Sequence, residues 1–136
     1  MPLIEWIPAY SVGVSEFDHD HQQIMRMLNE LNDAMRERRG KLVVGRILTE
    51  LLAYTERHFG AEEAAMKRCG YPKYQQHYTE HRSLTQRVKL FSAEFELGDA
   101  LISIDVLYFL RDWLETHILQ SDRAYAECLS TESKQS

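Results

Sequence analysis

Apolar residues recur along the chain at steps of three and four, the spacing that places side chains on one face of a helix. This pattern predicts four long helices, over residues 15–38, 42–69, 73–97 and 101–128. The chain has only three prolines and six glycines, so few residues interrupt these segments. Short connections force consecutive helices to run antiparallel, which predicts an all-α, up-down-up-down four-helix bundle.

Several residues at the predicted boundaries favour the start or the end of a helix. Ser15 and Asp18 suit the start of the first helix, because their side-chain oxygens accept hydrogen bonds from free amides. Gly70 is expected in a left-handed conformation after the second helix, and Pro72 at the start of the third. Gly98 and the residue after it are expected to end the third helix.

The two ends of the chain lie outside the predicted helices. Residues 1–14, which include Trp6, Ile7 and Tyr10, are expected to lie across the bundle as an arm without an element of its own. The polar residues 130–136 are expected to form a frayed tail. A chain of 136 residues has the length of one compact domain, so we expect residues 1–136 to form a single domain.

The charge of the chain argues against several partners. The formal net charge is −5, and no dense basic segment is present, so we expect no binding to nucleic acid or to anionic membranes. The first residues lack a basic stretch followed by an apolar one, and no apolar run approaches the ~18 residues of a membrane span. The sequence therefore predicts a cytoplasmic protein, which we expect to be a monomer.

The chain contains two cysteines, Cys69 and Cys128, and neither belongs to a CxxC pair. In a cytoplasmic protein this pattern predicts two reduced, half-buried thiols. The alternatives are a disulfide or a reactive thiol. The spacing of the two cysteines alone does not decide among these states.

Five of the six histidines fall on or beside the apolar faces of the predicted helices. Antiparallel packing brings the start of the first and third helices to the same end of the bundle as the end of the second and fourth. Two acidic residues lie on the same helix faces at that end. The seven residues are His21, His58, Glu62, His77, His81, His117 and Asp122.

This convergence of polar side chains in a core points to metal binding. Each buried polar group without a partner costs ~1 to 3 kcal/mol, so seven would exhaust the ~5 to 15 kcal/mol that stabilises a small domain. Imidazole nitrogens and carboxylate oxygens directed at one centre are ligands of transition metals. His77 and His81 are four residues apart, which places them on one helix face. His117 and Asp122 are five apart, so the helix must widen between Ile118 and Asp122 into a π-like turn.

Seven ligands exceed the needs of one ion, whereas two carboxylates that each bridge suit a pair of ions. Imidazole suits iron, so two iron ions are the expected metals. Three histidines, two bridging carboxylates and a solvent-derived bridge complete six positions on one iron. The other iron, with two histidines, keeps one open position for a small molecule.

The order of these residues resembles the hemerythrin family in its single-domain bacterial form. The similarity covers residues ~6–125 and rests on five segments, which are Asp18-His19-Asp20-His21, His58-Phe59 with Glu62-Glu63 and Met66, Gly70-Tyr71-Pro72, His77 with His81, and Trp113-Leu114 with His117-Ile118 and Asp122. All seven ligand positions carry the residue types of that family at matching spacings.

The resemblance implies a non-haem di-iron centre (Fe2+/Fe3+) with an oxo or hydroxo bridge that binds dioxygen reversibly, without acting as an enzyme. It implies that His77, His81 and His117 hold the saturated iron, that His21 and His58 hold the open one, and that Glu62 and Asp122 bridge. Nitric oxide and small anions are further ligands of the open iron. The apolar oxygen pocket that the family pattern implies consists of Ile24, Phe59, Trp113, Leu114 and Ile118.

Two polar residues near these segments are not expected to bind metal. His19 points ~160° away from His21 on a helix, so we expect it to be exposed. Glu63 is expected to be an outer or surface carboxylate.

Three other functions are compatible with a histidine-rich bundle. Di-iron oxidases use Glu-x-x-His on two helices, and this chain has that spacing only once, from Glu16 to His19. A sensing module that reports oxygen, redox state or nitric oxide to a separate partner is the second. A structural zinc bundle is the third and the least favoured, because zinc would leave ligands unused.

Overall fold

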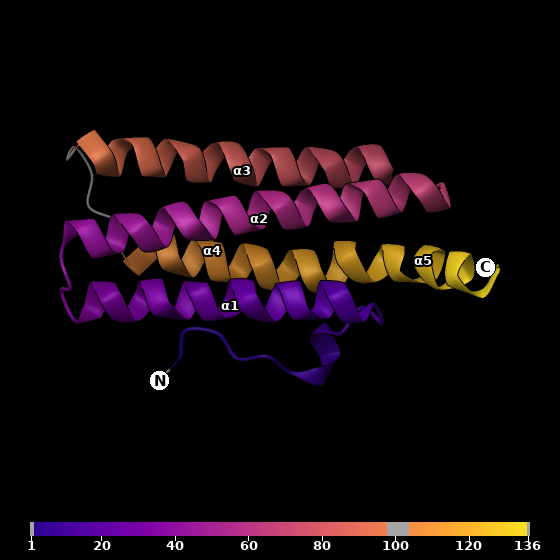
Figure 1. The fold of residues 1–136 in the computed structure, drawn as a ribbon, viewed down its shortest axis with the longest axis horizontal. Coiled ribbons are helices and arrows are strands. Elements are labelled where there is room, and N and C mark those ends of the chain that lie inside the picture. Colours follow the sequence, from indigo (N-terminus) through magenta and orange to yellow (C-terminus); the bar gives the residue numbers. More distant parts are fainter. Residues whose placement is uncertain (1, 98–103, 136) are drawn as a thin grey trace.

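The computed structural model describes the backbone of residues 2–97 and 104–135, and these residues contain helices but no strand. The elements in chain order are the 3₁₀ turn η1 (Pro8–Tyr10), α1 (Ser15–Arg36), α2 (Lys41–Cys69), α3 (Tyr74–Leu97), α4 (Ile104–Thr116), the π-helix η2 (His117–Asp122) and α5 (Arg123–Gln135). The last three elements are continuous and form one rod. Figure 1 shows the four rods of an up-down-up-down bundle, as predicted.

The first three helices begin and end within two residues of their predicted limits. Gly70 follows α2 with a φ of 71° and a ψ of 38°, the left-handed conformation that its sequence context predicted. Pro72 precedes the first residue of α3, Tyr74, by two positions. The predicted end of the third helix at Gly98 lies outside the described residues.

The fourth rod widens where the spacing of its polar residues requires it. His117–Asp122 form a π-helix, which confirms the widening predicted between Ile118 and Asp122. The wider turn lets two side chains five residues apart point to the same side of the rod. Both His117 and Asp122 are buried as a result.

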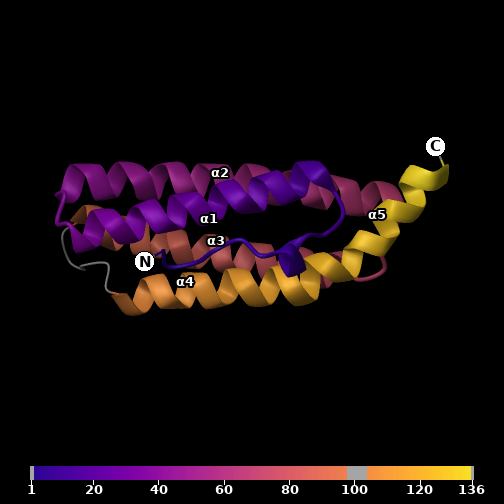
Figure 2. The same cartoon turned by 90° about the horizontal axis from the view of Figure 1, so that it is seen from below.

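The prediction of a frayed tail was wrong, because α5 continues to Gln135. Residues 129–135 contain neither glycine nor proline, so nothing in the sequence stops the helix after Cys128. Figure 2 shows that α5 leaves the direction of α4 beyond η2 and turns towards the C-terminal end of α2. The two helices pack against each other there.

The two cysteines form a disulfide between the end of α2 and α5. The Cα atoms of Cys69 and Cys128 lie 5.9 Å apart. The prediction of two separate reduced thiols was therefore wrong. A sequence separation of 59 residues gives no sign that the turned end of the fourth rod reaches the second helix.

Two polar side chains of α1 hold the N-terminal arm against the bundle, the carboxylate of Asp18 and the amide of Asn29. Asp18 accepts hydrogen bonds from the backbone amide of Val12 and the hydroxyl of Ser11. It therefore fixes the arm rather than capping α1, whose first turn has no side-chain cap. Asn29 binds both backbone polar groups of Ile4. The arm was expected to lie across the bundle without an element of its own, but it runs along the bundle and contains the short 3₁₀ turn η1.

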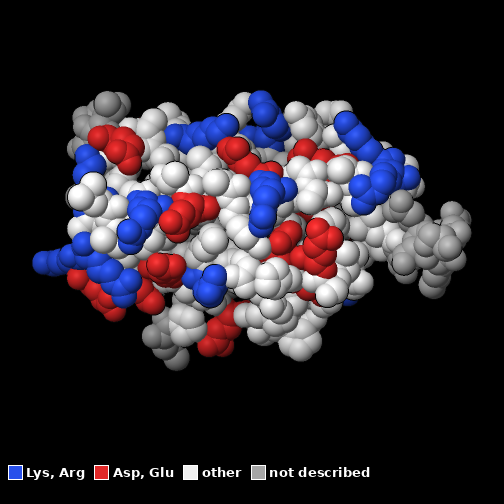
Figure 3. Space-filling view, viewed as in Figure 1, with Lys and Arg blue, Asp and Glu red and all other residues white. Residues whose placement is uncertain are grey.

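The main apolar core runs from the far end of the bundle up to the polar side chains, where Phe59 and Ile118 belong to it. Leu28, Leu31, Ile47 and Leu107 are almost completely buried there. The core includes most of the apolar faces predicted from the sequence. On the face drawn in Figure 3, acidic and basic side chains are interspersed. Among the described residues, no helix has the length and apolar character needed to cross a membrane.

Candidate metal centre

The structure brings together all seven predicted donor residues at one end of the bundle. They come from α1, α2, α3 and η2, so every rod contributes at least one donor. No donor side chain exposes more than 5% of its surface. These residues are His21, His58, Glu62, His77, His81, His117 and Asp122.

The donor atoms form two groups that share both carboxylates. Within each group the atoms all lie within 4.8 Å of one another. The larger group has three imidazoles and the smaller has two, alongside Glu62 and Asp122 in both cases. The imidazoles of the larger group are those of His77, His81 and His117. The imidazoles of the smaller group are those of His21 and His58.

Asp122 lies between the two groups, with one oxygen directed to each. Its Oδ1 is 2.9 Å from Nε2 of His77 and 3.0 Å from Nε2 of His117. Its Oδ2 is 3.1 Å from Nε2 of His21. Ligands ~2.1 Å from one ion at right angles lie ~3.0 Å apart, so these separations suit neighbouring ligands of an octahedral ion. The carboxylate of Asp122 therefore contacts both donor groups.

Glu62 contacts both groups from the opposite helix. Its Oε1 is 3.3 Å from Nε2 of His58 and 3.4 Å from Nε2 of His81. Its Oε2 accepts a hydrogen bond from the hydroxyl of Tyr125. Tyr125 is completely buried, and burial together with the nearby carboxylates raises the pKa of its hydroxyl. The sequence analysis did not identify Tyr125. Its position one helical turn after Asp122 is the only feature of the sequence that points to it.

Several buried donor atoms have no hydrogen-bond partner of acceptable geometry. They include Nε2 of His21, His58 and His77, Oε1 of Glu62 and Oδ1 of Asp122. An unpaired polar atom in a core is costly, and a cation placed among these atoms would satisfy all of them. The residues present therefore fit a pair of metal ions.

Three further carboxylates lie behind the imidazoles. Nδ1 of His58 is 2.9 Å from Asp20, Nδ1 of His81 is 2.8 Å from Glu63, and Nδ1 of His117 is 2.9 Å from Glu80. An imidazole that donates its Nδ1–H to a carboxylate directs the lone pair of Nε2 at the metal. Glu63 has the outer position predicted for it, whereas sequence reasoning missed the other two.

The missed carboxylates share a sequence signal. Asp20 directly precedes His21, and Glu80 directly precedes His81, so each adjoins a donor on its own helix. Each nevertheless supports an imidazole on another helix, which only the packing of the rods reveals. Tyr54 and Ser121 donate further hydrogen bonds to these two carboxylates.

The carboxylates hold protons on imidazoles in the absence of metal. Burial disfavours the charge on His21, but the adjacent carboxylates of Asp122 and Glu62 outweigh burial and raise its pKa to about 9. Burial likewise opposes the charge on His117, and the nearby Asp122 prevails and raises the pKa to about 10. The hydrogen bond from His117 lowers the pKa of Glu80 to about 2. Metal ions must displace these protons to bind.

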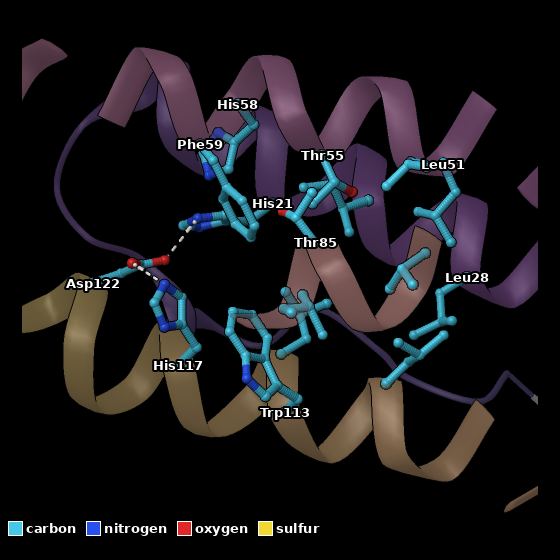
Figure 4. Close-up of a pocket in the computed structure, with 16 residues that line it drawn as sticks. His21, Leu28, Leu51, Thr55, His58, Phe59, Thr85, Trp113, His117 and Asp122 are labelled. Atoms are coloured by element: carbon cyan, nitrogen blue, oxygen red, sulfur yellow. Dashed lines mark ion pairs between the residues drawn. The ribbon is translucent and has the colours of Figure 1, made fainter. Parts of the chain in front are cut away.

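A small apolar cavity adjoins one side of the centre (Figure 4). Its volume is about 50 Å³, more than the ~10 to 15 Å³ needed for one water molecule. Both histidines of the smaller group line it, together with Asp122, but only His117 of the larger group does. The cavity therefore opens on the pair of ligands formed by His21 and His58.

Four of the five residues predicted for an oxygen pocket line this cavity. They are Ile24, Phe59, Trp113 and Leu114. Ile118 is completely buried but is not among the lining residues. His19 is exposed and lies away from the centre, as its position on α1 predicted.

Comparison with known proteins agrees with this geometry. The model of the hemerythrin HHE cation binding domain matches residues 12–129. The chain belongs to the hemerythrin family. Hemerythrin membership supports a di-iron, oxygen-binding protein and agrees with the resemblance of the sequence segments.

Hemerythrin relatives match nearly the whole chain. The bacteriohemerythrin of Methylococcus capsulatus is 34% identical over 96% of this chain and 99% of its own length. That of Stenotrophomonas maltophilia is 33% identical over 93% of this chain and 82% of its own. A crystal structure of wild-type hemerythrin has a TM-score of 0.89 at 32% identity and covers 94% of this chain and 98% of its own.

Proposed function

We propose that this chain binds dioxygen reversibly at a non-haem di-iron centre, as a carrier or store rather than an enzyme. One observation carries the proposal. The two donor groups share both carboxylates, and the group with fewer histidines faces the apolar cavity. An open coordination position on that side would be reached through the apolar cavity, which suits a small uncharged molecule.

The residues divide into a saturated and an open set. His77, His81 and His117 would hold one iron, and His21 and His58 the other, with Glu62 and Asp122 bridging. A pair of iron ions held by these residues, with an oxo or hydroxo bridge, would supply the electrons needed for reversible dioxygen binding.

The protein side chains control access and polarity. The side chains of Ile24, Phe59 and Leu114 contain no hydrogen-bonding group, so water gains little by contacting these walls. The carboxylates behind three imidazoles fix their orientation and increase their basicity.

The cavity also favours binding over catalysis. Its titratable lining residues, within the described part of the chain, are all candidate metal ligands. No separate acid or base is therefore present there to process a substrate. A volume of about 50 Å³ has room for a diatomic molecule, so nitric oxide and small anions are the expected competitors of dioxygen.

The complete donor set comes from one chain, so a monomer suffices for this function. A sensing role would use the same centre and would require a separate partner.

Metal content and gas release test the proposal. Purified protein is expected to contain about two irons per chain and, in air, to show oxo-to-iron(III) charge-transfer absorption in the near ultraviolet. Anaerobically reduced protein should take up dioxygen and release it intact when the gas is removed. One iron per chain, zinc alone, or steady consumption of dioxygen with a reductant would reject the proposal.

A matched pair of variants tests the ligand assignment. His77→Ala is expected to lose metal, because an ion in the core would lack a ligand. His19→Ala removes an exposed imidazole and should retain both irons. Equal iron contents in the two variants would contradict the assignment.

A further inference from the structure

The disulfide lies close to the metal centre along both helices that it joins. Cys69 follows Glu62 by seven residues on α2, and Cys128 follows Tyr125 by three residues on α5. Spacings of three and seven keep side chains on one face of a helix. The disulfide and the hydrogen bond from Tyr125 to Glu62 therefore connect the same two helices on the same side.

Apolar packing and the disulfide hold the described part of α5 against the rest of the bundle. Its apolar residues join a small cluster that is separate from the main core. The buried members of this cluster are Val12, Phe17, Ala65, Met66, Tyr125 and Leu129. Since α5 turns away from the bundle axis beyond η2, the disulfide is the covalent link that keeps its buried face against α2 (Figure 2).

The two cysteine residues are more exposed than the metal ligands. Cys69 and Cys128 are both half-buried, whereas Glu62 and Asp122 are almost completely inaccessible. Cys69 is the last residue of α2 and is followed by the exposed Gly70. A thiol from solution can therefore reach the disulfide without entering the metal centre.

We propose that Cys69 and Cys128 form a reversible thiol–disulfide site that controls how fast the centre exchanges its metal ions. With the bond formed, α5 keeps Tyr125 on the bridging carboxylate of Glu62. With the bond reduced, α5 separates from α2 more often, and each opening breaks that hydrogen bond and displaces Asp122. The inference rests on the metal centre of the proposed function but not on dioxygen binding.

The reaction is an exchange with a dithiol. One thiolate of the dithiol attacks a protein sulfur and forms a mixed disulfide, and the second thiolate then displaces the protein thiolate. The protein gains two electrons and two protons as two thiols, and the dithiol leaves as its own disulfide. The oxidised dithiol reverses the change.

Metal release from two forms of the same protein tests the inference. Iron-loaded protein is treated with dithiothreitol, its thiols are blocked with iodoacetamide, and the iron is returned to the ferric state in air. Transfer of iron to a ferric chelator is then compared with that from untreated protein. We expect release about five to thirty times faster after treatment, the change that a modest loss of local stability produces.

A double variant separates the bond from the treatment. Cys69→Ser/Cys128→Ser protein should release iron as fast as blocked wild type, and dithiothreitol with iodoacetamide should not change its rate. The inference is overturned if treated and untreated wild type release iron at equal rates. It is also overturned if alkylated wild type releases iron fast while the double variant does not, or if mass spectrometry shows that dithiothreitol never reduces the disulfide. A chain purified without iron would instead contradict the proposed function, and failure to bind dioxygen would leave this assay intact.

Discussion

Tyr125→Phe removes a single hydroxyl from the bridging carboxylate of Glu62. The ring continues to pack against Phe17, Tyr71 and His77, so the cavity and the helix contacts stay the same. Oε2 of Glu62 loses its hydrogen-bond donor in a side chain with no exposed surface. The substitution therefore isolates one hydrogen bond to a buried charge.

The expected cost depends on whether metal is present. Without metal, loss of a hydrogen bond to a charged group lowers the free energy of unfolding by about 1.5 to 3 kcal/mol. At roughly 4 °C per kcal/mol for a domain of this size, the Tm falls by about 6 to 12 °C. With two ions bound, the cations satisfy the oxygens of Glu62, and we expect the loss to shrink below about 1 kcal/mol.

Thermal unfolding of chelator-treated and iron-loaded protein measures both values. Tyr71→Phe is the matched control, because its ring also contacts Tyr125, while its hydroxyl makes no hydrogen bond to the described residues. That variant should change stability by less than about 0.5 kcal/mol in either form. An equal loss in the two variants, or a larger loss in the iron-loaded form of Tyr125→Phe, would refute the reasoning.

Three other predictions concern the surroundings of the metals. Glu80→Gln keeps an acceptor for His117 but removes its charge, and iron affinity measured by chelator competition should fall about 10- to 100-fold. In metal-free protein the pKa of His21 is raised to about 9, so its stabilising contribution is complete below about pH 6.5 and is lost as the pH rises through about 9. The Tm of metal-free protein should therefore fall over that range, while iron-loaded protein should not show this loss. Ile24→Ala enlarges the apolar cavity, and we expect a stability loss of about 2 to 5 kcal/mol with faster oxidation of reduced iron by air.

Matched controls for two of these lie away from the centre. Glu30→Gln removes an exposed carboxylate on α1 and should leave iron affinity unchanged. Ile47→Ala removes a buried side chain of the main core that does not line the cavity, so it should reduce stability without accelerating oxidation. Identical oxidation rates in Ile24→Ala and Ile47→Ala would contradict a role of the cavity wall. A Tm of metal-free protein that rises from pH 6.5 to 9 would contradict the role of His21.

Periodicity and spacing were sufficient to predict the bundle and the set of candidate donors. The step of five from His117 to Asp122 even predicted the π-helix, because two inward side chains at that spacing require a wider turn. These features are local, so each could be worked out from one helix and its apolar face.

Features that depend on the packing between helices were not predictable in the same way. Asp20 and Glu80 adjoin donors in the sequence, but each supports an imidazole of a different rod. The direction that α5 takes after η2 decides that Cys128 reaches Cys69, and no periodic pattern records that direction. Tyr125 reaches Glu62 for the same reason.

The outer carboxylates link the rods in a closed circuit. Asp20 of α1 orients His58 of α2, Glu63 of α2 orients His81 of α3, and Glu80 of α3 orients His117 of η2. Asp122 of η2 then contacts His21 of α1 and completes the round. Removing any one rod would deprive its successor of support, so half of the molecule cannot retain half of the centre. A circular permutant that preserves the spatial order of the rods should keep the circuit intact.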